Sequence, residues 1–138
     1  MRQGFLILSL ATLSAPLLAS QATDLSDIFG GGALEGEELE KALAEASKHP
    51  LGSEQNPVRV NMPAGQRAYL SRLRCENGKK PKFERGGSVG ANPFGSIVDV
   101  YKVECGKSAP GNVSVYLDMY HPRHHEDNAV PGFTIVAK

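Results

Sequence analysis

Residues 112–120 have the sequence NVSVYLDMY, in which apolar and polar side chains alternate from Val113 to Tyr120. A period of two places successive side chains on opposite faces of a β-strand, so this stretch predicts a strand with one buried face. The apolar face holds Val113, Val115, Leu117 and Met119. The other face holds Ser114, Tyr116, Asp118 and Tyr120. Such one-sided strands are typical of antiparallel sheets.

Four further segments alternate in the same way or are rich in residues that favour β-structure: 57–61, 67–75, 97–105 and 133–137. We expect 67–75 to be a strand with Tyr69, Leu73 and Cys75 on one face. The Asn77-Gly78 dipeptide after it is typical of a tight turn. The glycine-rich stretch that follows predicts a long loop.

Before the first strand, residues 37–48 predict a helix, since Leu39, Leu43 and Ala46 recur at helical spacing and Pro50 ends the pattern. The chain therefore predicts an α+β fold. We expect an N-terminal helix followed by a mainly antiparallel sheet or small barrel of about five strands.

The first 22 residues have the pattern of a secretory signal peptide: one positive charge, an uncharged apolar run, and small residues before a cleavage point after Ala22. The glycine triplet 30–32 predicts a flexible segment over 23–36, which leaves 37–138 as one small domain. We expect the mature chain to be periplasmic or extracellular, without a membrane anchor after signal cleavage.

Cys75 and Cys105 are the only two cysteines. In an exported chain this predicts a disulfide, which would contribute about 3–4 kcal/mol to stability by closing a loop of some 30 residues. Because the two are not spaced as Cys-x-x-Cys, a redox role is disfavoured.

Charge is uneven along the chain. Residues 23–54 carry a net charge of −6 and residues 55–105 a net charge of +5. The basic stretch includes Arg72 and Arg74, which a strand over 67–75 would place on one face. A nucleic-acid-binding domain usually has a net positive charge and aromatic residues among its basic ones, so this class of partner is disfavoured.

Residues 121–128, HPRHHEDN, hold three of the four histidines. Imidazole suits zinc and copper, so His121, His124 and His125 are a candidate metal site. Adjacent residues such as His124 and His125 point apart on an extended chain, however, and structural zinc sites usually draw ligands from two segments. An exposed polar loop that binds no metal is the competing interpretation, and it requires no cofactor.

Two stretches of the sequence hold residues typical of catalytic sites. Gly86–Gly90 matches the G-x-S-x-G pattern of serine hydrolases, but the Ala-Asn-Pro-Phe-Gly that follows cannot begin the required helix. His121 with Asp118 or Glu126 would suit acid–base chemistry, although no sequence feature holds these groups together. Neither amounts to a credible catalytic constellation, so we expect a non-enzymatic protein.

The expected function is therefore an exported domain that recognises another macromolecule, either a protein or another component of the envelope. Tyrosine and arginine are favoured at recognition surfaces. The candidate partner-binding residues are Tyr116, Asp118, Tyr120, Arg72 and Arg74. The alternative is a periplasmic or extracellular metal-binding protein that uses the histidine-rich loop 121–125.

Overall fold

The computed structural model describes residues 33–138 of the chain. The predicted signal peptide (1–22) and most of the predicted flexible segment (23–36) lie outside the described residues. Within them the α+β class is confirmed, and the elements follow in the order α2, β1, α3, β2, β3, β4, β5, β6.

The main sheet has four strands in the order β1-β5-β4-β3. Strands β5 (Asn112–Asp118), β4 (Ile97–Glu104) and β3 (Lys82–Ala91) are antiparallel, with Val115 opposite Tyr101 and Val113 opposite Val103. The short strand β1 (Val58–Arg59) pairs with β5 in parallel. The prediction of a mainly antiparallel sheet of about five strands is therefore only partly right, because the sheet is mixed and has four strands.

The expected strand over 67–75 is wrong for most of its length. Residues Met62–Arg72 form helix α3, and only Leu73–Arg74 extend as strand β2, antiparallel to β6 (Thr134–Ile135) in a separate two-stranded sheet. Leu70 and Leu73 are fully buried and Tyr69 nearly so. Residues spaced by three and four lie on one helix face, which explains why these apolar positions fit a helix.

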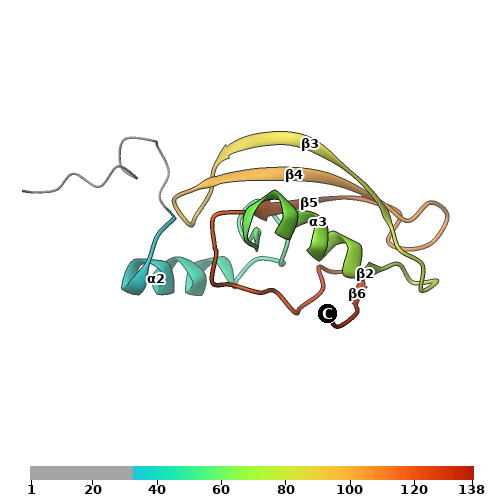
Figure 1. Cartoon of the computed structure of the whole chain (residues 1–138), viewed down its shortest axis with the longest axis horizontal. Coiled ribbons are helices and arrows are strands. Elements are labelled where there is room, and N and C mark those ends of the chain that lie inside the picture. The colour runs from blue at the N-terminus through green and yellow to red at the C-terminus, as the bar shows by residue number, and fades with distance from the viewer. Residues whose placement is uncertain (1–32) are drawn as a thin grey trace, which may run out of the picture.

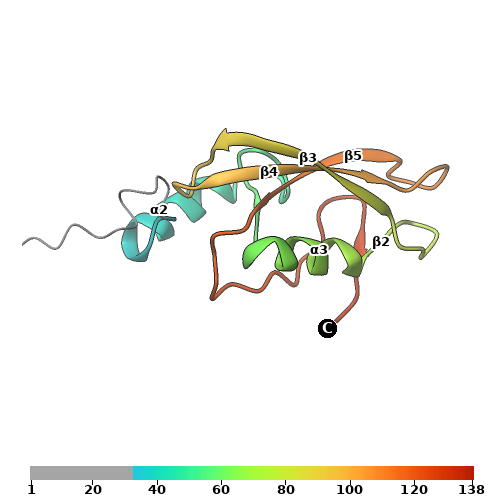
Figure 2. The same cartoon turned by 45° about the horizontal axis from the view of Figure 1, so that its top comes forward.

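The core lies between α3 and one face of the main sheet. In Figures 1 and 2, α3 lies across this face and the C-terminal segment lies beside it. The buried apolar residues of β4 and β5 on this face are Tyr101 and Val103 of β4 and Val115 and Leu117 of β5. The alternation that predicts β5 thus places the expected side chains in the core.

The glycine-rich stretch expected to be a loop is largely strand β3. Its Ser88 donates a hydrogen bond of 2.8 Å to the buried carboxylate of Asp99, which also accepts bonds from Arg85 and from Gln66 of α3. Ser88 therefore lies on an extended strand that is tied to the core, not on the strand-to-helix turn that a hydrolase nucleophile needs.

Helix α2 (Gly36–Ala46) overlaps most of the segment 37–48 that predicts a helix, and it lies at one end of the sheet (Figure 1). Leu39 and Leu43 are half-buried, and Ala46 is its only buried residue. The chain before it is held by a hydrogen bond of 2.7 Å from Leu34 N to Phe94 O. None of the described helices is long and apolar enough to cross a membrane.

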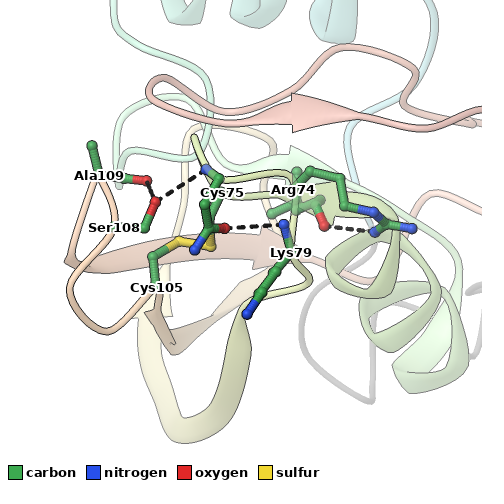
Figure 3. Close-up of a disulfide and its surroundings, with 8 residues drawn as sticks. Arg74, Cys75, Lys79, Cys105, Ser108 and Ala109 are labelled. Atoms are coloured by element: carbon green, nitrogen blue, oxygen red, sulfur yellow. Dashed lines mark hydrogen bonds between the residues drawn. A yellow bond between two sulfur atoms is a disulfide. The ribbon is translucent and has the colours of Figure 1, made fainter.

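The predicted disulfide is confirmed. Cys75 and Cys105 are bonded with a Cα–Cα distance of 5.8 Å, and they join the segment after β2 to the end of β4 (Figure 3). The turn that follows Cys75 is closed by a hydrogen bond of 2.8 Å from Gly78 N to Cys75 O. The bond therefore ties the two sheets together at one end of the domain.

Candidate functional site

The histidine loop, residues 121–128, begins three residues after β5 ends. Its first backbone amide, His121 N, donates to Val60 O at 3.1 Å, and Tyr120 forms an isolated bridge with Asn61. The loop therefore starts from the edge of the main sheet where β1 pairs with β5.

The Asp118 side chain connects several groups at the start of the histidine loop. Its Oδ2 atom accepts hydrogen bonds from Ser96 Oγ and from Asn92 Nδ2 (2.9 Å), and it lies 2.9 Å from His121 Nε2. The other oxygen, Oδ1, accepts a bond of 3.0 Å from Tyr120 N. The side chain is fully buried. Asp118 therefore does not lie on an exposed strand face, because groups of the 92–96 turn and of the histidine loop cover it. A role of Asp118 in partner binding stays a prediction.

The electrostatics of Asp118 match this geometry. Burial by itself would raise its pKa, but hydrogen bonds from His121, Ser96 and Tyr120 outweigh burial and lower the pKa below the ordinary value. The carboxylate lies between the serine and the histidine, whereas a nucleophilic triad needs the histidine between serine and carboxylate. The cluster is therefore arranged to hold the start of the loop.

Arg72, the last residue of α3, holds the far end of the loop. Its guanidinium donates to Val136 O (2.9 Å), Glu126 O (2.9 Å) and Asp127 Oδ1 (2.8 Å), and it lies 3.1 Å from His125 Nε2. The residue is only 8% exposed. The expectation that Arg72 and Arg74 share one face of a strand is wrong, because Arg72 ends helix α3 and turns into the loop. Partner binding by Arg72 and Arg74 stays a prediction.

Tyr69 of α3 adds a second connection. Its hydroxyl donates to Asn128 O at 2.9 Å and accepts from Val130 N at 3.1 Å. Burial, the largest cause, raises the pKa of this hydroxyl above its usual range. The side chain therefore acts as a neutral bridge that fixes the loop on the helix.

His124 and Glu126 form a pair inside the loop, with His124 Nε2 3.2 Å from Glu126 Oε2. Burial alone would raise the pKa of Glu126, but hydrogen bonds from His124 and from Asn128 outweigh burial and lower the pKa to about 2. Glu126 therefore stays charged down to strongly acidic pH.

The three histidines of the candidate metal site have different acidic neighbours. His121 contacts Asp118, His124 contacts Glu126, and His125 lies 3.1 Å from Asp127. Among residues 33–138, no group of three or more histidine, cysteine or acidic side chains is placed to hold a metal ion. Metal binding by His121, His124 and His125 stays a prediction.

Two pockets flank the ridge formed by Pro122, Arg123 and His124, and all three ridge residues line both pockets. The larger pocket has a volume of about 470 Å³ and lies between the loop and α3, where Ala64, Gly65 and Ala68 line it. The smaller pocket has a volume of about 220 Å³ and lies between the loop and the start of α2. Its remaining lining comes from Ala33, Leu34, Glu35, Gly36, Leu39, Arg59, Tyr120 and His121.

The predicted partner-binding residues are not brought together. Tyr120 is 37% exposed and lines the smaller pocket, and Arg72 lines the larger one. Tyr116 is half-buried on β5 opposite Val100 and lines neither pocket. Arg74 is bonded to its own turn, at 2.7 Å from Leu73 O and 3.0 Å from Ser71 O.

Arg59 of β1 was not among the predicted site residues, yet it lines the smaller pocket. Its Cζ atom lies 5.8 Å from the centre of the buried Phe94 ring. The sequence signal was present but weak, since Arg59 is the polar residue between two valines that turn inward.

Comparison with known proteins gives no assignment, because no known protein family, curated protein or solved structure matches the chain.

Proposed function

We propose that the chain is an exported, non-enzymatic domain that recognises another macromolecule through the face made by the histidine loop and its two pockets. The observation that carries the proposal is the ridge Pro122–His124, which lines both pockets. Because these three residues line both pockets, a partner that contacts the ridge would meet a wall of each pocket. Ligand sites are typically such hollows with a few polar groups in their walls.

Rigid support of the ridge favours this use. Asp118 holds the loop at His121, while Arg72 and Tyr69 hold it at residues 125–130. A surface fixed before binding loses less conformational entropy when a partner docks. The hydrogen bonds made by these buried groups serve to position the loop.

Exposed residues at the ridge supply contact chemistry. Arg123 has a side chain that is 87% exposed, and Tyr120 lies beside it on the wall of the smaller pocket. Tyrosine and arginine are enriched where protein interfaces gain most of their free energy. Export to the periplasm or medium is supported by the disulfide, which persists in oxidising compartments.

Site-specific photocrosslinking in native cells tests the proposal. A photoreactive residue at position 123 is expected to trap one saturable partner. The same residue at Lys102, an exposed position on β4 that lines neither pocket, is expected not to trap it. Tyr120→Ala is expected to weaken capture with the melting temperature unchanged. Equal crosslinking from both positions, or no saturable product from position 123, would show that this face is not the recognition surface.

A further inference from the structure

Arg59 has an unusual environment on the wall of the smaller pocket. The residue is half-buried, with its guanidinium over the face of Phe94, and Phe94 packs edge-to-face on His121 at a centroid distance of 5.6 Å. A guanidinium stacked on an aromatic ring keeps its N–H edges available for hydrogen bonds in its own plane. This contact leaves the N–H groups of Arg59 available to a ligand in the smaller pocket.

The charge of Arg59 lacks a direct partner within residues 33–138. No hydrogen bond of its guanidinium and no carboxylate within 4 Å is found in this part of the chain. Burial, the largest cause, lowers its pKa, and the more distant charges of Glu126, Glu40 and Asp118 oppose that shift. Arginine stays charged in proteins, and a partly desolvated charge without a partner is costly. A ligand carboxylate would supply the missing partner.

The other walls of the smaller pocket indicate what such a ligand looks like. Arg123 is a second cation there, and its nearest carboxylate is Glu35 at 3.6 Å in an exposed pair. Leu34 and Leu39 give the pocket an apolar side. The pocket thus combines positive charge from its arginines with aliphatic surface from its leucines. An acidic side chain, which carries its carboxylate on a short methylene stem, fits this combination better than an inorganic anion.

We infer that the smaller pocket binds a glutamate or aspartate side chain of a partner protein, with the carboxylate paired to Arg59 and the stem on Leu34 and Leu39. This inference rests on the proposed function, and it identifies a carboxylate as the group that the recognition surface binds. Planar, two-point pairing with a carboxylate is the recognition mode for which arginine is suited and lysine is not.

Titration of the oxidised, exported chain with acetyl-Gly-Glu-Gly-Glu-Gly-amide tests the inference. Calorimetry gives the affinity, and the Arg59 Nε–Hε resonance in a nitrogen–proton correlation spectrum reports the contact directly in the wild type. We expect saturable binding that shifts this resonance. The glutamine analogue and inorganic phosphate are expected to bind at least about tenfold more weakly, since they lack the charge or the stem.

Two substitutions separate charge from geometry. Arg59→Gln and Arg59→Lys are both expected to weaken the glutamate peptide roughly tenfold, because lysine keeps the charge but loses the two-point pairing. Arg67→Gln is the matched control, since Arg67 is exposed on α3 and lines neither pocket. If the Arg59 variants do not fold, the wild-type resonance still decides.

Four outcomes would overturn the inference: an unshifted Arg59 resonance, equal binding of the glutamine peptide, phosphate binding as tight as the glutamate peptide, or full affinity in Arg59→Lys. If the glutamate peptide binds only to the Asp24→Asn/Asp27→Asn variant, the pocket's occupant would instead be an acidic side chain of the same chain. If the peptide titration fails but crosslinking at position 123 succeeds, the proposed function still holds and only the inference is rejected. If both experiments fail, the proposed function is rejected as well.

Discussion

The Nε2 atom of His121 lies 2.9 Å from Oδ2 of Asp118, and this contact joins the end of strand β5 to the start of the histidine loop. Both side chains are buried, and the imidazole also packs on Phe94 beneath Arg59. The residue that opens the loop is therefore also part of the support for the smaller pocket. Changes to Asp118 are expected to act on stability first and on binding as a consequence.

Asp118→Asn is expected to destabilise the domain by roughly 2–4 kcal/mol, because one buried carboxylate oxygen accepts from several donors and an amide cannot satisfy all of them. Urea unfolding at pH 7 measures the change. Glu104→Gln is the control, since Glu104 is exposed on β4, and it is expected to stay within about 0.5 kcal/mol of wild type. Equal effects of the two substitutions would contradict the role assigned to Asp118.

Glu126 is expected to make stability depend on acid pH. Its pKa is about 2 in the folded chain against an ordinary value of 4.5, so its stabilisation is fully present above pH 4.5 and is lost as pH falls toward 2. Glu126→Gln should therefore cost roughly 2–3 kcal/mol at pH 6 and almost nothing near pH 2. Thermal unfolding of both proteins across this range measures the difference, and a constant difference at all pH values would refute the prediction.

Gly52 and Gly78 form a matched pair for backbone strain. Both have positive φ angles, +83° and +76°. A Cβ atom on Gly52 would collide with the side chain of Val130, whereas one on Gly78 would meet nothing within 4 Å. Gly78→Ala is expected to cost roughly 1 kcal/mol and Gly52→Ala at least about 1–2 kcal/mol more. Urea unfolding compares them, and similar losses would mean that the Val130 side chain moves aside at little cost.

The sequence was most informative where one periodicity excluded another. Strict alternation over residues 113–117 would place successive apolar side chains on opposite sides of a helix but on one face of a strand, so β5 and its buried face could be predicted. In the segment 67–75, placing Tyr69, Leu73 and Cys75 on one face favoured a strand, although Pro63 just before it suits the start of a helix. The structure selects the helix because Gln66 and Arg72 are buried in it. Their burial depends on hydrogen-bond partners more than 30 residues away in the sequence.

The candidate site was predictable only in its location. The histidine-rich composition drew attention to residues 121–128, and the two pockets do lie on either side of this loop. The roles of individual residues depended on tertiary contacts. Asp118 and Arg72 have the polarity of surface residues but are buried by their hydrogen-bond partners, and Arg59 gained its place from the Phe94 ring, 35 positions later in the chain.

Zinc titration tests the alternative function assigned to His121, His124 and His125. Each imidazole lies within 3.2 Å of a different acidic side chain, and His121 is buried. A shared metal would have to break these pairs and pull His121 out of its packing on Phe94. We therefore expect weak binding without one-to-one saturation in calorimetry, and little change in the His121→Ala/His124→Ala/His125→Ala variant. Saturable one-to-one binding at micromolar affinity that this variant loses would establish the metal site, and would mean that the loop rearranges around the ion.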